Sequence, residues 1–302
     1  MLENWGDVDV DVDVDGTRIH ATVKGDGPPV LLLHGYPQTH VMWHRVAPGL
    51  VDRHTVVLAD LRGYGDSSRP ASTADHASYS KRAMATDQVG LMHELGFDTF
   101  SVVGHDRGAR VAHRLCLDHP GAVSRVALLD IVPTRHVFTH VDRALAQTYY
   151  HWFFLSQEAD LPEHLIGADP DYFLRRKLDQ WSGSRGSAAF APEAVEEYVR
   201  CFRDPEVIRA TCEDYRAAAS IDLEHDEVDA VAGRRVECPA LVLWGAEGFV
   251  GRAYDVLEVW RAYATDVRGQ ALGGGHFLVE EEPGATLTAL RDFLTAPAVD
   301  HG

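Results

Sequence analysis

The sequence predicts an α/β fold: a mostly parallel central sheet with helices on both of its faces, and an inserted helical cap. Short segments that are apolar at nearly every position alternate with helical patterns along much of the chain. Such segments are typical of strands that are buried on both faces of a parallel sheet. Between residues 134 and 232 the alternation stops, and aromatic residues and helical patterns take its place.

The first residues favour a strand at the edge of this sheet. Residues 7–15 alternate Asp and Val, which predicts one face of valines against the core and one face of carboxylates in water. A calcium loop of the EF-hand type would need a central glycine and a closing glutamate at set positions. We therefore do not expect calcium to bind this run.

The remaining elements follow in chain order. Residues 29–33, 55–60, 99–103, 125–130 and 240–245 are expected strands, because they are almost entirely apolar. Helices are expected over 83–95, with Gly96 as its C-cap, and over 109–115. A glycine-rich loop at 273–277 precedes a last helix at 285–294, which closes the core.

The helical stretch divides the chain into two domains. Residues 1–133 and 233–302 are expected to form the two parts of the α/β core, and residues 134–232 the cap. Helical patterns within the cap lie at residues 149–154, 172–178, 193–202 and 212–219.

Composition excludes several classes of function. The 302 residues carry a net charge of −18 at pH 7, so nucleic acids and anionic membranes would be repelled. The four cysteines show no Cys-x-x-Cys spacing and are too few for a disulfide framework. The N-terminus lacks a signal-peptide pattern, and no apolar run reaches membrane-spanning length. These features favour a reduced, cytoplasmic protein.

The most informative motif is the turn Gly104-His105-Asp106-Arg107-Gly108. It joins an expected strand to an expected helix, and small residues lie two positions either side of Asp106. This is the strand–turn–helix context of the nucleophile in α/β hydrolases. A serine there would indicate acyl transfer, whereas a carboxylate indicates attack on a saturated carbon, which leaves an ester on the enzyme.

A carboxylate nucleophile needs a base to activate water and an acid to orient that base. His276 is the expected base, because its glycine-rich loop follows the last strands, where the hydrolase chain order places the catalytic histidine. Asp130 is the expected acid, because it ends a strand at the carboxyl edge of the sheet. Glu247 is an alternative, since Gly248 occupies the position where such an acid often stands. Asp130 could instead cap the following turn.

Two arginines and two backbone groups complete the expected site. The backbone N–H groups of Tyr36 and Arg107 are the expected donors to an oxyanion. Arg107 and Arg110 lie three residues apart at a helix start, so they share a face. Their guanidiniums would favour ionised Asp106 and could bind a small carboxylate. The alternative is that one or both arginines form structural salt bridges.

These residues carry a resemblance that covers essentially the whole chain. The sequence resembles the fluoroacetate dehalogenases, which are haloacetate dehalogenases of the α/β-hydrolase superfamily. The most specific match is Gly-His-Asp-Arg-Gly followed by Arg110, together with His151-Trp152 in the cap. The other matching segments are residues 34–38, 60–67, 129–134, 150–154, 212–216 and 275–277.

The resemblance implies roles for the residues at the sheet edge. It implies Asp106 as the nucleophile, His276 as the base and Asp130 as its partner. It places the substrate carboxylate on Arg107 and Arg110. Gly248 agrees with the use of the earlier acid.

The resemblance also implies a halide site in the cap. His151, Trp152 and Tyr215 would donate ring N–H and phenolic O–H groups to the departing halide. The alternative for His151 and Trp152 is packing onto the core. Trp181 is an expected pocket wall, and Tyr36 stands where the family more often has Phe, which would alter the polarity of the pocket.

The expected reaction is hydrolytic dehalogenation in two steps. Asp106 would displace halide from the α-carbon of a small haloacid, and His276 would then activate water against the resulting ester. The products are glycolate, halide and a proton, and no metal or organic cofactor is required. The resemblance also implies a homodimer.

Two other functions remain open at this point. An epoxide hydrolase would use the same Asp106 with tyrosine acids in the cap, for which Tyr149, Tyr150 and Tyr215 are available. Arg107 argues against it, because a neutral epoxide has no use for that charge. The second is a non-catalytic protein that binds a small carboxylate, and the complete Asp–His–Asp set weighs against it.

Overall fold

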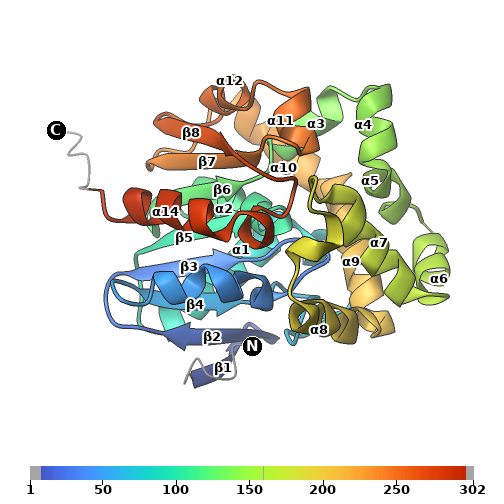
Figure 1. Ribbon diagram of the computed structural model, residues 1–302, viewed down its shortest axis with the longest axis horizontal. Coiled ribbons are helices and arrows are strands. Elements are labelled where there is room, and N and C mark those ends of the chain that lie inside the picture. The colour runs from blue at the N-terminus through green and yellow to red at the C-terminus, as the bar shows by residue number, and fades with distance from the viewer. Residues whose placement is uncertain (1–7, 159, 297–302) are drawn as a thin grey trace.

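The computed structural model describes residues 8–158 and 160–296. Its centre is an eight-stranded sheet of order β1-β2-β4-β3-β5-β6-β7-β8 (Figure 1). The first two pairings, β1 with β2 and β2 with β4, are antiparallel, and the other neighbours are parallel. The strands are β1 (Val8–Val14), β2 (Thr17–Lys24), β3 (Pro29–Leu33), β4 (Thr55–Ala59), β5 (Phe100–His105), β6 (Val123–Leu129), β7 (Ala240–Gly245) and β8 (Val267–Leu272).

Helices cover both faces of this sheet. Successive residues of a strand point to opposite faces, and every residue of β4 is buried, so neither face is open there. This confirms the predicted α/β fold. The core helices are η1 (His40–Arg45), η2 (Ala47–Gly49), η3 (Ala77–Tyr79), α1 (Lys81–Glu94), α2 (Arg107–Asp118), α11 (Phe249–Ala253), α12 (Val256–Arg261), α13 (Leu278–Glu281) and α14 (Pro283–Leu294).

Between β6 and β7 the described residues form helices. Figure 1 shows α5 to α9 gathered on one side of the sheet. These helices are α3 (Thr134–Thr139), α4 (Arg143–Thr148), α5 (Tyr150–Leu155), α6 (Leu161–Gly167), α7 (Pro170–Trp181), η4 (Gly186–Ala189), α8 (Pro192–Phe202), α9 (Pro205–Ala218) and α10 (Ile221–Val231). We propose residues 134–232 as the cap on this basis.

The apolar runs predicted as strands are strands, with ends shifted by at most two residues. Strands β2 and β8 have no separate counterpart among the predictions, because exposed polar residues interrupt their apolar pattern. Helix α1 begins two residues before its predicted start, since the Ser80 hydroxyl accepts the Ala83 backbone N–H and caps the helix there.

The Asp-Val run forms the edge strand β1, whose pairing with β2 runs from Val8 to Val14. Asp11 and Asp13 are exposed, whereas Val10 and Val12 pack against the core. Asp7 lies outside the described residues. None of the helices described is long and apolar enough to cross a membrane.

Candidate active site

Asp106 lies on a sharp turn between β5 and α2. Its backbone has φ of +46° and ψ of −111°, a region that residues other than glycine rarely occupy. The neighbouring glycines allow this turn: a Cβ at Gly104 would lie 2.4 Å from the Gly108 oxygen, and a Cβ at Gly108 would lie 2.4 Å from the His34 oxygen. Backbone strain of this kind is typical of functional sites.

The Asp106 carboxylate is buried beside several positive groups. The Tyr36 backbone N–H donates to Oδ1 at 2.9 Å, and Nε2 of His276 lies 3.8 Å from Oδ2. Burial raises the pKa of the carboxyl, but His276 and the arginines Arg107 and Arg110 outweigh burial and hold the pKa below its usual value. Asp106 is therefore ionised at neutral pH, as nucleophilic attack requires.

His276 and Asp130 lie in direct contact. Nδ1 of His276 is 2.7 Å from Oδ2 of Asp130, and Oδ1 of Asp130 accepts the Gly245 backbone N–H at 2.9 Å. Burial lowers the pKa of His276, but the bond to Asp130 and the charges of Asp130 and Asp106 raise it above its usual value overall. This contact fixes the ring so that Nε2 faces the nucleophile.

The two alternatives for the orienting acid do not fit this geometry. Glu247 accepts the Ser184 backbone N–H at 2.5 Å and the Ser184 hydroxyl at 3.3 Å, and so binds the cap. Asp130 does not cap α3, whose N-cap is Pro133. Among the predicted acids, the structure brings Asp130 to His276.

Glu281, in α13, supports the loop that carries His276. Its buried carboxylate accepts backbone N–H groups from Gly275 and Phe277 in that loop, at 2.9 and 3.0 Å, and from Gly183 in the cap, at 2.8 Å. Glu281 is not among the predicted site residues, because nothing in the sequence separates it from the acidic residues beside it.

Arg107 forms a buried ion pair with Asp214 of α9. Its Nε and Nη2 donate to the two carboxylate oxygens at 2.8 and 2.5 Å, and Lys81 also contacts this carboxylate. The alternative that Arg107 forms a structural salt bridge is therefore correct in part. Its Nη1, however, is buried without a hydrogen-bond partner among the described residues. Asp214 is not among the predicted site residues, since its burial depends on packing between α9 and the core.

Arg110 lies next to Arg107 without a carboxylate partner in the part of the chain that the structure describes. Its Nη1 donates to the Val132 oxygen and the Thr134 hydroxyl, both at 3.0 Å, and its Nε is buried without a partner. Burial, and next the charge of Arg107, lower the pKa of Arg110. The site thus contains a buried cation that forms no ion pair with a described carboxylate, although the charge of Asp106 acts on it.

Three predicted cap residues converge beside these arginines. The ring centroid of Tyr215 lies 5.6 Å from that of His151 and 6.2 Å from that of Trp152, and Cζ of Arg110 is 4.5 Å from the Trp152 ring. Nδ1 of His151 and the Tyr215 hydroxyl are buried without partners. Packing onto the core therefore does not account for the polar atoms of His151 and Tyr215.

Trp181 and Tyr36 extend the same wall. The Trp181 ring lies 4.3 Å from His151 and 5.8 Å from His276, and the Tyr36 ring lies 5.5 Å from Tyr215. The Trp181 indole N–H and the Tyr36 hydroxyl are also buried without partners. We call Tyr36, His151, Trp152, Trp181 and Tyr215 the aromatic cage. Trp181 is predicted only as a pocket wall, but its indole N–H is also available as a hydrogen-bond donor.

The cage and the arginines indicate what could bind here. A buried polar atom without a partner costs about 1–3 kcal/mol, so several of them beside one nucleophile indicate a site that a polar ligand completes. Unpartnered donors and a buried cation without an ion-pair partner favour an anion. With the ionised Asp106 and the His276–Asp130 pair, the arrangement can displace a leaving group from a small anionic substrate and then hydrolyse the ester.

Lys177, in α7, is a buried cation behind the cage. Its Nζ lies 2.5 Å from the Tyr150 hydroxyl and 5.1 Å from the Trp181 ring centroid, and none of the described carboxylates pairs with it. Burial, and next the charge of Arg176, lower its pKa to about 7. Tyr150 is 39% exposed and bonded to Lys177, so it is not available as an acid in the site.

Lys177→Met is expected to raise the free energy of unfolding at pH 7 by about 1 kcal/mol or more, because it removes an unpaired buried charge. The unfolded chain binds the lysine proton up to about pH 10.5, whereas the native chain loses it near pH 7. The free energy of unfolding of the wild type therefore rises with pH in this window. In denaturant unfolding, the difference in free energy of unfolding between Lys177→Met and the wild type should become smaller towards pH 10. The exposed neighbour Arg176 supplies the control, Arg176→Met, and an equal gain there would contradict this explanation.

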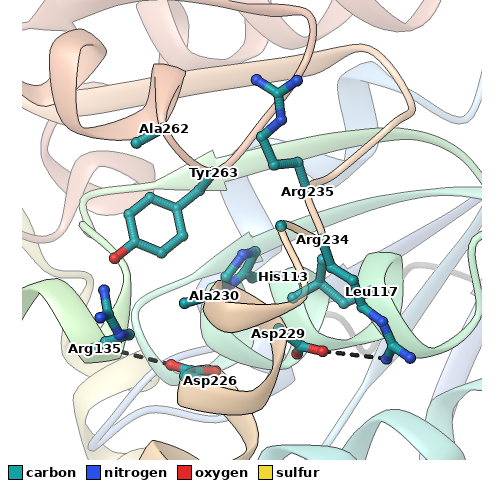
Figure 2. Close-up of a pocket in the computed structure, with 11 residues that line it drawn as sticks. His113, Leu117, Arg135, Asp226, Asp229, Ala230, Arg234, Arg235, Ala262 and Tyr263 are labelled. Carbon is teal, nitrogen blue, oxygen red and sulfur yellow. Dashed lines mark hydrogen bonds and ion pairs between the residues drawn. The ribbon is translucent and has the colours of Figure 1, made fainter.

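A separate cavity of about 290 Å³ lies between α2, α10 and the segment before β7. Figure 2 shows His113 in its lining, with the Arg135 backbone N–H directed to Asp226 and Arg234 paired with Asp229. It contains none of the predicted catalytic residues.

Known proteins similar to this chain share its fold and most of its length. The alpha/beta hydrolase fold model matches residues 28–283. A fluoroacetate dehalogenase from Burkholderia sp is 50% identical over 284 residues, which cover 94% of this chain and 92% of that protein. A soluble epoxide hydrolase from Corynebacterium sp. (strain C12) is 34% identical over 283 residues, 93% of this chain and 95% of that protein. A solved structure assigned to the alpha/beta hydrolases, from Nostoc sp PCC 7120, is 57% identical with a TM-score of 0.95, and covers 97% of this chain and 99% of that chain.

Proposed function

We propose that this chain, which belongs to the alpha/beta hydrolase fold family, hydrolyses a small 2-haloacid such as fluoroacetate or chloroacetate to glycolate and halide. It is a hydrolase that acts on carbon–halogen bonds, as its 50% identity to a fluoroacetate dehalogenase supports. The observation that carries the proposal is the ionised Asp106 beside two buried arginines, each with an unpartnered nitrogen.

In the first step Asp106 attacks the α-carbon of the substrate. Its Oδ1 is held by the Tyr36 backbone N–H, so Oδ2 is the free oxygen that forms the new bond. The carbon–halogen bond breaks and its electron pair leaves with the halide. In-line attack places the halide opposite Oδ2, where we assign His151, Trp152 and Tyr215 as its donors and Trp181 as a further donor. Nδ1 of His151, the Tyr215 hydroxyl and the Trp181 indole N–H are buried without another partner.

We assign the substrate carboxylate to Arg107 and Arg110. Nη1 of Arg107 and Nε of Arg110 are the buried donors that remain free in this structure. Charge-assisted bonds to a carboxylate are short and strong, and they orient the α-carbon towards the nucleophile.

In the second step water hydrolyses the ester on Asp106. His276 takes a proton from water through Nε2, while Asp130 stabilises the ring cation that forms. The water oxygen attacks Cγ of Asp106, and negative charge develops on Oδ1, which the Tyr36 N–H already contacts. We assign the Arg107 backbone N–H as the second oxyanion donor. Glycolate, halide and a proton leave, and these steps use no metal or organic cofactor.

Asp214→Asn is expected to lower kcat/KM for a haloacid, mainly through a higher KM, because Asp214 holds the Arg107 guanidinium in place. Loss of a hydrogen bond to a charged group costs about 1.5–3 kcal/mol, or roughly 10- to 100-fold in kcat/KM. Steady-state kinetics measure the change. Tyr64→Phe is the matched control, since Tyr64 also bonds to Asp214 but does not touch Arg107 through its hydroxyl. An equal loss in both variants would contradict the positioning role.

Halide release by the purified protein tests the proposal itself. Fluoro-, chloro- and bromoacetate should each be compared with styrene oxide, and we expect turnover of haloacetates but not of the epoxide. The Tyr36 and Tyr215 hydroxyls are both free and could polarise an epoxide oxygen, which makes this comparison necessary. Turnover of styrene oxide without halide release would establish the epoxide hydrolase instead. Stoichiometric binding of haloacetate without turnover would establish a non-catalytic protein.

The proposal also includes a homodimer and a cytoplasmic location, both expected from the sequence. Light scattering of the purified protein tests the first, and a dimer mass is the expected result. Fractionation of the source cells tests the second.

A further inference from the structure

Three side chains that commonly bind metals meet outside the active site. They are His20 in β2, His40 at the start of η1, and Asp60 directly after β4. The nitrogen and oxygen atoms that they can offer to a metal all lie within 4.8 Å of one another. Across residues 8–158 and 160–296, no other group of three His, Cys, Asp or Glu residues is gathered this closely.

The register of the sheet builds two members of this cluster into the fold. Strands β2 and β4 are antiparallel with Ala21 opposite Ala59, so His20 comes opposite Asp60. The Asp60 backbone N–H donates to the His20 oxygen at 2.9 Å, which continues the ladder to this pair. Side chains directly opposite each other in an antiparallel pair lie on the same face, with Cβ atoms about 5 Å apart.

The His20 ring is held through its Nδ1. Its Nδ1 lies 3.2 Å from Oδ1 of Asp11, and Arg18 donates to the same oxygen at 2.8 Å. The carboxylate fixes the ring proton on Nδ1 and leaves Nε2 with a free lone pair. Pairs of this kind commonly orient histidines that bind metals.

A proton lies between His40 and Asp60, and a metal ion could take its place. Nδ1 of His40 is 3.0 Å from Oδ1 of Asp60, and the His40 backbone N–H donates to the same oxygen at 2.8 Å. His34 approaches Oδ1 at 3.7 Å, but its Nε2 accepts the Leu61 backbone N–H, which leaves no lone pair for a metal. The ligand set is therefore two imidazoles and one carboxylate.

We propose that His20, His40 and Asp60 form a binding site for a divalent transition metal of the zinc class, with water as the fourth ligand. Two histidines and a carboxylate are a ligand set that suits Zn²⁺. Tetrahedral ligands at zinc distances lie about 3.3 Å apart, so the atoms must approach by roughly 1.5 Å, and the partly exposed His20 ring can make that movement. Binding releases to solvent the proton that lies between His40 and Asp60.

The site is separate from the reaction at Asp106. A metal there would join β2, η1 and the residue that follows β4. The first expected consequence is therefore a more stable fold.

Calorimetric titration of the metal-free protein with Zn²⁺ tests the proposal. The wild type should bind one ion per chain, and His20→Ala should bind at least about 10-fold more weakly. His140→Ala is the matched control, because the ring of the exposed His140 stacks on that of the half-buried His136 at 4.1 Å, and this pair could bind an adventitious ion. That variant should bind as the wild type does.

A second variant and a second readout keep the test decisive if His20→Ala is unstable. Asp11→Asn, at an exposed position, should weaken Zn²⁺ binding by about 10-fold through the His20 orientation. Zn²⁺ should raise the melting temperature of the wild type and of His140→Ala, but not of His20→Ala. Wild-type affinity in both His20→Ala and Asp11→Asn, or loss of binding in His140→Ala, would overturn the proposal.

Discussion

Asp106→Asn is expected to release no measurable halide from any haloacetate, a loss of about 10⁴-fold or more in kcat. An amide keeps the shape of the side chain and an oxygen for the Tyr36 backbone N–H, but it lacks the negative charge that forms the ester. A halide-selective electrode measures the loss directly. The lowered pKa of Asp106 means that the wild type keeps this charge across the neutral range, so lowering the pH within that range does not reproduce the defect.

Two controls separate this chemical loss from misfolding. Thermal unfolding should show a folded variant, because the turn at Asp106 depends on Gly104 and Gly108 rather than on the carboxylate charge. Asp66→Asn makes the same chemical change at a half-exposed carboxylate that pairs with Arg200, and it should release halide as the wild type does. Halide release by Asp106→Asn within tenfold of the wild type would exclude Asp106 as the nucleophile.

His276→Asn is expected to release one halide per active site and then stop. Displacement of halide uses the ionised Asp106, the two arginines and the cage but no general base, whereas hydrolysis of the ester needs the base that Asp130 orients. The variant should therefore accumulate a protein heavier by one carboxymethyl group, which intact mass spectrometry detects. Proteolysis should place the added mass on the peptide that contains Asp106.

The exposed His93 supplies a matched control for this experiment. His93→Asn changes the same residue type far from the site and should turn over as the wild type does, without an adduct. Normal multiple turnover by His276→Asn would exclude His276 as the base. Absence of both halide release and adduct would instead place His276 in the first step.

The sequence predicts this fold well where local pattern determines the structure. Strands β3 and β7 begin and end where their apolar runs do, because a strand buried on both faces needs an apolar residue at every position. Strands β2 and β8 lack that pattern, and their pairing with neighbouring strands makes them strands: β2 pairs with β1 and β4, and β8 pairs with β7. The turn at Asp106 is predictable because close backbone contacts require glycine at 104 and 108.

The residues that support the site could not be predicted from local sequence pattern. Asp214 and Glu281 are buried only because α9 and α13 pack against the core, and each then binds partners far along the chain or in a separate loop. Lys177 has the helical spacing of an ordinary solvated lysine, yet the packing of α7 buries it beside Tyr150. Their roles depend on tertiary contacts, which spacing in the sequence does not encode.

The central claim is an ester on Asp106 that water cleaves at Cγ. A single turnover of the wild type, with enzyme in excess over chloroacetate in water labelled with heavy oxygen, tests it most directly. We expect unlabelled glycolate and label in the Asp106 carboxylate, because the oxygen that enters glycolate comes from Oδ2 of Asp106. Labelled glycolate in that first turnover, with no label on Asp106, would contradict it, since water would then have attacked the substrate carbon directly.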